Sequence, residues 1–200
     1  MEFTHPFTAI IAGPTGCGKA VFTFRFITEA LITPPPELFC YCYSEYQPIF
    51  DEFPQVRFMH GLPDPNDFDG EKRVLLIIDD LMAEAGDSVA NIFTKFSHHR
   101  NISVVFIAQN VFHKSKQSRT MSLNSHYMII FKNPCDTLQV QTLARQMYPG
   151  KSKFLTDAYK DATEKPYGYL VLDLKPETGE KFRVRTNIFP GEVQYVYLPK

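Results

Sequence analysis

A glycine-rich segment near the N-terminus has the residue types and spacing of a phosphate-binding loop. Residues 13–19 read Gly-Pro-Thr-Gly-Cys-Gly-Lys, which matches the pattern G-x-x-x-x-G-K. Glycines let backbone N–H groups turn toward an anion, and a following helix directs its positive end to the same place. We therefore predict that the phosphates of ATP bind here, with Lys19 on the β and γ phosphates. The predicted binding residues are Gly13, Pro14, Thr15, Gly16, Cys17, Gly18, Lys19 and Ala20.

The last of these residues departs from the usual pattern. Ala20 stands where a Ser or Thr normally supplies a hydroxyl ligand to Mg²⁺. Alanine cannot coordinate a metal, so a water must replace the hydroxyl or Mg²⁺ binds less well. We expect nucleotide binding to survive this change, whereas efficient hydrolysis is an open question.

Two adjacent carboxylates follow an apolar stretch, Val74-Leu-Leu-Ile-Ile, at positions 79 and 80. A buried strand that delivers acids at its carboxyl end is the usual partner of a phosphate-binding loop. We predict that Asp79 holds Mg²⁺, usually through water, and that Asp80 orients or deprotonates the attacking water. The alternative is that one of them merely caps the next turn, which is common for aspartate.

Other polar residues could complete the site. Gln109 ends the next apolar stretch and would point at the γ phosphate if its strand lies between the first strand and the Asp79 strand. Arg100, Arg119 and Arg145 are candidates for an arginine finger that acts on a neighbouring subunit, although each could be an ordinary surface arginine. Lys114, Lys116 and Arg119 form a positive loop that could contact a DNA backbone or could simply be solvated.

The elements that must position these residues alternate between short apolar runs and longer helical stretches. This alternation predicts one α/β domain over residues 1–200, with a mainly parallel sheet flanked by helices. The expected strands are Phe7–Ala12, Leu38–Tyr43, Arg57–His60, Arg73–Asp80, Ile102–Ala108 and Tyr127–Lys132, with a closing hairpin of Tyr167–Leu174 and Lys181–Thr186. The expected helices are Lys19–Leu31, Ser88–His98, Thr137–Met147 and Lys151–Thr163, with a polar loop over His113–Arg119. A strand before the glycine-rich segment and a helix after it favour a phosphate site over a tight turn that binds nothing.

Composition and charge limit the other possibilities. The longest apolar runs are about five residues, far short of the roughly twenty that a membrane span requires, so we expect no membrane partner. The first residues lack the pattern of a secretory signal. Cys40 and Cys42 are expected on opposite faces of a strand, and without a C-x-x-C pair we expect reduced thiols and no zinc. Residues 1–100 hold 7 Lys and Arg against 14 Asp and Glu, whereas residues 101–200 hold 14 against 8, an asymmetry that can mark a side facing a polyanion.

Several segments together resemble a known family. Besides residues 13–19, they are Ile77-Ile-Asp-Asp-Leu-Met82, residues 97–110 (Ser-His-His-Arg-Asn to Ala-Gln-Asn), Ser118-Arg-Thr-Met-Ser-Leu-Asn124, Tyr127–Pro134, residues 144–150 and residues 165–170. They are similar to the poxvirus-type DNA-packaging ATPases of the FtsK–HerA superfamily, with the closest look to the versions in Maverick/Polinton elements and adintoviruses. The resemblance covers nearly the whole chain, and its glycine-rich part is the least specific.

The resemblance implies a RecA/FtsK-like fold and a homo-oligomeric ring, a pentamer or hexamer. Such a ring would use Mg²⁺ and ATP to pump double-stranded DNA into a capsid, with capsid proteins as partners. The setting would be the interior of a host cell, in the nucleus or cytoplasm or on the virion, without secretion. Residue by residue it implies Lys19 on phosphate, Asp79 and Asp80 as the metal and water-activating pair, and Gln109 as the sensor.

A second departure bears on activity. Cys135 stands where similar sequences tend to have Arg, so Arg119 would have to act as the finger, or hydrolysis falls. Two other functions therefore stay open. One is a relative that binds nucleotide with weak or no turnover, and the other is a P-loop kinase for a small molecule. A kinase would usually carry a lid rich in arginine, and residues 136–165 contain only Arg145.

Overall fold

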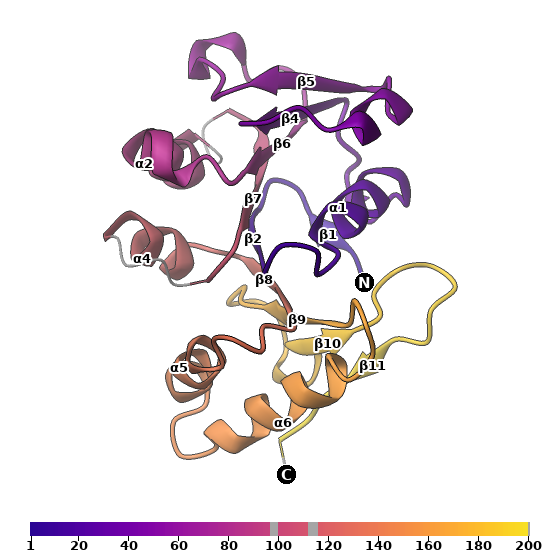
Figure 1. Cartoon of the computed structure of the whole chain (residues 1–200), viewed down its shortest axis with the longest axis vertical. Coiled ribbons are helices and arrows are strands. Elements are labelled where there is room, and N and C mark those ends of the chain that lie inside the picture. The colour runs from indigo at the N-terminus through magenta and orange to yellow at the C-terminus, as the bar shows by residue number, and fades with distance from the viewer. Residues whose placement is uncertain (97–99, 112–115, 200) are drawn as a thin grey trace.

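The central sheet has helices on both of its faces (Figure 1). The structure is a computed structural model, and it describes residues 1–96, 100–111 and 116–199. Within these residues nine strands form the large sheet, in the order β11-β10-β9-β8-β2-β7-β6-β4-β5. The strands are β2 (Thr8–Ala12), β4 (Leu38–Tyr43), β5 (Val56–His60), β6 (Val74–Asp79), β7 (Ile102–Ala108), β8 (Tyr127–Phe131), β9 (Tyr169–Asp173), β10 (Val184–Thr186) and β11 (Tyr195–Val196). In this order the neighbouring strands β8, β2, β7, β6, β4 and β5 are parallel to one another. At the other end of the sheet, β9 pairs antiparallel with β8, β10 with β9, and β11 with β10. The expected mainly parallel sheet with a closing hairpin is confirmed.

The helices divide between the two faces of the sheet. They are α1 (Lys19–Thr28), α2 (Met82–Asn91, continued by a π-helical turn over Ile92–Phe96), α4 (Lys116–Leu123), α5 (Leu138–Met147) and α6 (Ser152–Ala162). Short 3₁₀ turns lie at Pro48–Glu52, Pro65–Asp67 and Glu180–Phe182. Figure 1 shows α1 on one face and α2, α4 and α5 on the other, and the buried side chains form one core under each group. Across the described residues no helix is long and apolar enough to cross a bilayer.

The central strands are apolar throughout because both of their faces are covered. In β6, Leu76 and Ile78 enter the core beneath α2 and α5, whereas Leu75 and Ile77 enter the core beneath α1. All four side chains are fully buried, and each burial of this kind contributes about 1.5–3 kcal/mol. The sheet is therefore a rigid support, and the polar residues at its carboxyl edge are held in place by it.

Some elements differ from the expectations. Helix α1 ends at Thr28, because Ala30 takes a positive φ of 49° and the chain then forms β3 (Ile32–Thr33). Strand β3 pairs in parallel with β1 (Phe3–Thr4) in a separate small sheet that the sequence did not predict. Strand β11 was also not predicted. It is only two residues long, which is too short for an alternating pattern to predict.

Two further expectations were wrong. The helix expected at Ser88 begins six residues earlier, at Met82, and the basic stretch expected as a loop is helical from Lys116. Cys40 and Cys42 lie on the same face of β4, because alternate residues of a strand point the same way. All four cysteines are free thiols.

Candidate nucleotide-binding site

Three adjacent strands bring the candidate residues to one edge of the sheet. Strands β2, β7 and β6 are neighbours, and all three run in the same direction. The glycine-rich loop (residues 13–20) follows β2, Asp79 is the last residue of β6, and Gln109 follows β7. Strand β7 lies between β2 and β6, which is the condition under which we expected Gln109 to face the site. Ligands of open α/β sheets bind at this carboxyl edge.

The glycine-rich loop is held by close packing. A Cβ atom on Gly13 would stand 2.6 Å from Sγ of Cys17 and 2.7 Å from Cβ of Phe131, so only glycine fits there. Gly18 has φ of 105° at the start of α1, in a left-handed conformation that glycine adopts without strain. The backbone N–H of Gly13 donates to the carbonyl of Ala108 at the end of β7, which fixes the loop to the neighbouring strand.

Lys19 folds back onto its own loop. Its Nζ donates to the carbonyl oxygen of Gly13 at 2.6 Å and to that of Pro14 at 3.0 Å. Both are backbone acceptors of modest strength, and neither carries a full charge. A bound phosphate would offer charged oxygens, which form roughly twice as strong a hydrogen bond with an ammonium group. Lys19 is thus held beside the loop, where its ammonium group can exchange these carbonyls for the oxygens of a bound phosphate.

The carboxylate of Asp79 is held by a tyrosine that the sequence reasoning missed. The hydroxyl of Tyr41, in the adjacent strand β4, donates to Oδ2 of Asp79 at 2.8 Å. Burial raises the pKa of Asp79 above its usual value, while the Tyr41 hydrogen bond and the charge of Lys19 act in the opposite direction. Burial and the adjacent negative charge likewise raise the pKa of Tyr41, so its proton remains available for the bond. Asp79 is a desolvated carboxylate, and a cation placed opposite it would be favoured.

Asp80 and Gln109 form the second polar pair of the edge. Nε2 of Gln109 donates to Oδ2 of Asp80 at 2.9 Å, and both side chains are exposed. Asp80 has φ of 53°, a left-handed conformation that costs free energy in a residue with a side chain. The backbone N–H of Asp80 donates to the carbonyl of Ile107 in β7 and holds that conformation. In this turn the carboxylate of Asp80 lies within hydrogen-bond reach of Gln109.

These groups surround one cavity of about 590 Å³. Lys19, Asp79, Asp80 and Gln109 line it together with Thr15, Gly16, Gly18, Ala20, Val21, Ile107 and Ala108. The sequence reasoning missed the remaining lining residues, namely Tyr41, Tyr43, Ser44, Glu45, Gln47 and Tyr167, and it did not assign Val21, Ile107 or Ala108 to the site either. The end of the strand Leu38–Tyr43 was a usable signal for the first five. It would have required knowing that this strand lies beside β6.

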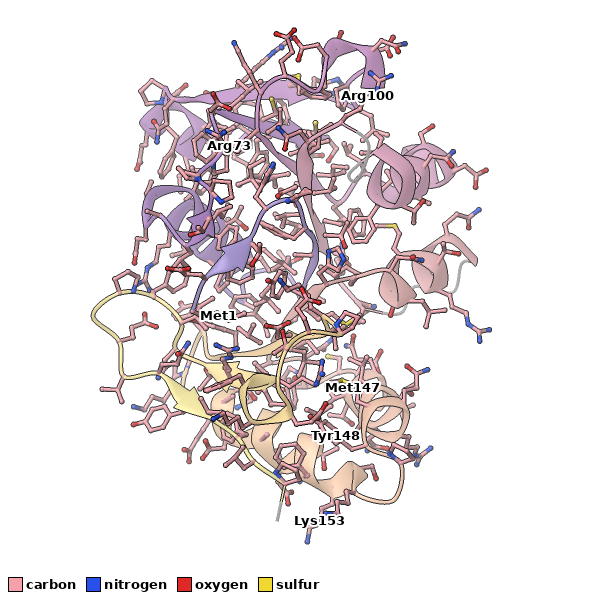
Figure 2. The ribbon with its side chains drawn as sticks, turned by 180° about the vertical axis from the view of Figure 1, so that it is seen from behind. Met1, Arg73, Arg100, Met147, Tyr148 and Lys153 are labelled. Carbon is pink, nitrogen blue, oxygen red and sulfur yellow. The ribbon has the colours of Figure 1, made fainter. Side chains whose placement is uncertain are left out.

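The arginine and lysine candidates lie in different places. Arg100 precedes β7, so it lies at the amino ends of the parallel strands, away from the carboxyl edge. Its guanidinium donates to the carbonyl of Phe68 at 2.9 Å. Figure 2 shows Arg100 and Lys153 at opposite ends of the molecule. Arg119 is exposed on α4, and Arg145 is exposed near the end of α5. Lys114 and the side chain of Lys116 lie outside the described residues, so their predicted DNA contact stays a prediction.

Two cysteines named in the sequence reasoning differ in environment. Burial raises the pKa of the Cys17 thiol, and the nearby charge of Lys19 only partly offsets this effect. The thiol therefore lacks the lowered pKa that a reactive cysteine requires. Cys135 is exposed after β8, and its backbone N–H donates to Oδ1 of Asn133 at 3.1 Å.

Solved structures of known proteins share this architecture. The DNA-packaging ATPase B204 from Sulfolobus turreted icosahedral virus is 11% identical, with a TM-score of 0.56 over 98% of this chain and 99% of B204. The genome packaging NTPase B204 from Sulfolobus turreted icosahedral virus 2, solved with AMP, is 10% identical, with a TM-score of 0.53 over 98% of each chain. The KaiC-like protein PH0186 from Pyrococcus horikoshii OT3 is 12% identical, with a TM-score of 0.50 over 97% of this chain and 90% of PH0186. No family model and no curated protein sequence matches the chain.

The fold is that of a P-loop NTPase. A likeness at such low identity establishes the arrangement of helices and strands and nothing finer. In this P-loop fold the glycine-rich loop between β2 and α1 occupies the position of the phosphate-binding loop.

Proposed function

We propose that this protein is an ATPase that moves double-stranded DNA into a viral capsid. The observation that carries the ATPase activity is the convergence of Lys19, the two aspartates and Gln109 on one cavity at the carboxyl edge of the sheet. P-loop NTPases use groups of these kinds to hold a triphosphate and to position the attacking water. Catalysis of phosphoryl transfer depends almost entirely on such positioning and on charge stabilisation.

The glycine-rich loop would hold the phosphates, with its backbone N–H groups and the first turn of α1 turned toward them. Lys19 would leave the carbonyls of Gly13 and Pro14 and contact the β and γ phosphates. This exchange replaces two neutral acceptors by charged ones.

The residues at the edge fit Mg²⁺, with one ligand missing. Asp79 is a desolvated carboxylate at the cavity, suited to a hard cation that prefers oxygen ligands. Ala20 also lines the cavity and has no oxygen to offer. Asp79, directly or through water, would hold the ion together with the phosphates, and the ion would neutralise charge on the phosphates. The missing hydroxyl weakens this site without removing it.

Asp80 and Gln109 would orient the attacking water. The 2.9 Å bond between them fixes the amide and the carboxylate relative to each other at the end of β7. The carboxylate of Asp80 can accept a proton from a water, and the amide of Gln109 can contact the same water or the γ phosphate. Of this pair, Asp80 is the general base that we propose, and Gln109 is the sensor.

Three observations support double-stranded DNA as the substrate that is moved. The likeness to the B204 packaging proteins spans nearly the full length of both chains, so no large part of the architecture is unaccounted for. The excess of Lys and Arg in residues 101–200 provides positive charge for a polyanion. Lys114, Lys116 and Arg119 are the DNA-contact residues that we propose, and Arg119 lies exposed on α4.

We further propose that the protein works as a homo-oligomeric ring of five or six subunits, inside a host cell and in contact with capsid proteins. Among the described residues that line the cavity there is no arginine. A neighbouring subunit would supply this cation, and Arg119 is the candidate that we favour. The family proposed is the poxvirus-type packaging ATPases, including the Maverick/Polinton and adintovirus versions.

The experiment is hydrolysis of Mg-ATP, measured with and without double-stranded DNA. The variants are Ala20→Thr, which restores the missing hydroxyl, Lys19→Ala, and Lys72→Ala as a control for loss of an exposed lysine. We expect hydrolysis that DNA stimulates, a gain in Ala20→Thr, a loss in Lys19→Ala, and no change in Lys72→Ala. Stimulation by DNA in the original chain would also show that a water can replace the hydroxyl.

A second candidate function is nucleotide binding with very slow turnover, and Ala20 is the observation that favours it. Hydrolysis only in Ala20→Thr would support this second function. Hydrolysis in neither protein, with normal ATP binding, would contradict the motor. Transfer of phosphate to an added nucleoside or nucleotide would instead establish a small-molecule kinase.

A further inference from the structure

A second hollow lies beside the glycine-rich loop. It has a volume of about 220 Å³ and is lined by Gly18, Val21, Phe22, Arg25, Phe131, Tyr167, Tyr169 and Phe189. Gly18, Val21 and Tyr167 also line the larger cavity that contains the two aspartates, so the two spaces adjoin. We call this space the aromatic hollow. Its lining is mostly apolar, unlike that of the larger cavity.

The strand order decides which end of a nucleotide would face the hollow. Asp79, Asp80 and Gln109 end β6 and β7, on one side of β2 and its loop. The γ phosphate must point to that side, because the groups that act on it are there. The nucleoside must then extend the opposite way, toward β8 and β9. The aromatic hollow lies on this side, since Phe131 ends β8 and Tyr169 begins β9.

Tyr167 stands at the border of the two spaces. It is 71% exposed, although a large aromatic side chain gains free energy from burial. Its ring approaches the loop closely, with Cδ1 only 3.2 Å from where a Cβ of Gly18 would stand. Tyr167 itself has φ of 62°, and the next residue, Gly168, has no room for a side chain against the carbonyl of Ala162. The turn is fixed, and it holds an exposed ring over the nucleotide-binding loop.

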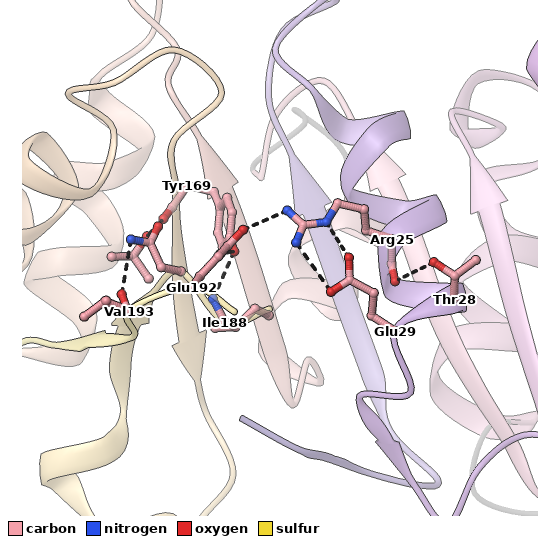
Figure 3. A network of polar contacts seen from close by, with 9 residues as sticks. Arg25, Thr28, Glu29, Tyr169, Ile188, Glu192 and Val193 are labelled. Carbon is pink, nitrogen blue, oxygen red and sulfur yellow. Dashed lines mark hydrogen bonds and ion pairs between the residues drawn. The ribbon is translucent and has the colours of Figure 1, made fainter. Parts of the chain in front are cut away.

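The opposite wall of the hollow is anchored by Arg25. Its guanidinium lies 4.0 Å from the ring centroid of Phe189. The same group donates to Glu29 at 2.7 Å and to Glu192 at 2.8 Å (Figure 3). The ring of Phe189 in turn meets that of Phe22 edge to face, with centroids 5.0 Å apart. These contacts tie the segment after β10 to α1. This wall of the hollow is therefore fixed by contacts within the chain itself.

Few polar side-chain groups in the hollow are available to recognise a base through hydrogen bonds. Arg25, Tyr167 and Tyr169 are the lining side chains with polar atoms. Arg25 is bound to two carboxylates, and the hydroxyl of Tyr169 accepts the N–H of Ile188 at 3.0 Å. A site that offers aromatic faces and few hydrogen bonds binds a base by stacking, and stacking tolerates every base.

We infer that the aromatic hollow binds the nucleobase of the triphosphate, with Tyr167 as its stacking platform, and that it discriminates weakly between adenine and guanine. This inference rests on the proposed binding of ATP and adds the site and selectivity of its base. Apolar pockets reject near-isosteric ligands weakly, whereas pockets built on hydrogen bonds reject them strongly. We expect the affinities for ATP and GTP to differ by less than about tenfold.

The test compares binding of ATP, GTP and inorganic tripolyphosphate by calorimetry in the absence of Mg²⁺. The variant Tyr167→Asn removes the ring and keeps a residue that tolerates positive φ. Tyr167→Phe keeps the ring, and Tyr195→Asn removes an exposed tyrosine elsewhere. We expect Tyr167→Asn to weaken ATP and GTP binding by about tenfold or more. Tripolyphosphate binding should not change, and the other two variants should bind as the original chain does.

The outcomes separate this inference from the function on which it rests. If the original chain binds neither ATP nor tripolyphosphate, the proposed function fails and the inference fails with it. If the original chain binds ATP and Tyr167→Asn binds it equally well, the base does not lie on Tyr167. An equal loss of ATP and tripolyphosphate binding in Tyr167→Asn would assign Tyr167 to the shape of the loop instead. A difference of more than about tenfold between the ATP and GTP affinities, in either direction, would overturn the weak selectivity.

Discussion

The hydroxyl of Tyr41 holds the carboxylate of Asp79 through a hydrogen bond of 2.8 Å between two neighbouring strands. In many P-loop proteins the residue after the loop lysine has a hydroxyl close to the metal. Here that residue is Ala20, and the hydroxyl that orients the carboxylate of Asp79 belongs to Tyr41. Tyr41 does not touch the nucleotide in this proposal, and it acts through Asp79.

Tyr41→Phe should lower hydrolysis of Mg-ATP by about 10–100-fold, as is typical when an outer partner of a metal ligand is removed. In the original chain the Tyr41 hydrogen bond lowers the pKa of Asp79, so the loss of this bond in the variant raises that pKa further. The acid limb of the pH–rate profile should therefore move to higher pH. The measurement is the profile of kcat for the variant and the original chain. Tyr127→Phe, which changes a tyrosine at the start of β8, is the control, and an unshifted acid limb would contradict the role.

Asp79→Asn should make the ligand-free protein more stable near neutral pH. Burial raises the pKa of Asp79, so between its usual and its raised value the folded state binds more protons than the unfolded state. Stability must then fall as pH rises through this window, and the cost persists above it. Asparagine removes the charge and still accepts the Tyr41 hydrogen bond.

Thermal melting at several pH values tests this prediction, since about 1 kcal/mol moves the Tm of a chain of this length by roughly 2–4 °C. The advantage of Asp79→Asn should shrink below the usual aspartate pKa of about 3.9, where the carboxylate is protonated in both states. If the Tm of Asp79→Asn at pH 8 were lower than that of the original chain, the prediction would be contradicted. Hydrolysis should be lost in the same variant, which would mark Asp79 as a residue that trades stability for function.

Gly13→Ala should destabilise the protein by about 1–3 kcal/mol, because the new Cβ would stand 2.6 Å from Sγ of Cys17 and 2.7 Å from Cβ of Phe131. Phe131 is fully buried and cannot move aside. Gly179→Ala is the matched control, since its Cβ would meet nothing within 4 Å. Urea denaturation of both variants gives the comparison. Equal midpoints would show that the loop is looser than this packing implies.

Arg25 and Glu192 should show a modest coupling in a double-mutant cycle. Their side chains are 37% and 30% exposed, so water screens the ion pair and we expect about 0.5–1 kcal/mol. The cycle uses Arg25→Gln and Glu192→Gln, with unfolding by urea as the measurement. Glu29 stays in place and still binds Arg25 in Glu192→Gln. A coupling near zero would mean that the ring of Phe189, and not the ion pair, holds the C-terminal segment to α1.

Cys17 should react slowly with iodoacetamide at neutral pH, and Cys135 should react first. Burial raises the pKa of Cys17, so little thiolate is present, whereas Cys135 is exposed. The rate at Cys17 should rise as the pH increases through and beyond the usual thiol range. Peptide mass spectrometry after timed labelling separates the two sites. Faster labelling of Cys17 than of Cys135 would show that the Cys17 thiol is more reactive than its burial implies.

Much of the site could be predicted because its signals are local. The glycine-rich loop is a run of adjacent residues, and Asp79, Asp80 and Gln109 each follow an apolar strand that can be recognised on its own. Parallel strands place their carboxyl ends at one edge, so the meeting of these residues followed from the fold class. The positive segment after Gln109 was predicted less well. Lys116 and Arg119 begin a helix, which their polar neighbours did not signal.

By itself the sequence determined the phosphate-type loop, the two aspartates, the missing hydroxyl at Ala20 and the mainly parallel sheet. Only the tertiary structure decided that Tyr41 reaches Asp79, that Arg25 joins Glu192, and that Tyr167 stands over Gly18. The physical reason is that the order of strands in a sheet is set by crossover connections and by packing between distant segments. A pattern of neighbouring residues records which face of a strand is buried, and it does not record which strand lies beside it.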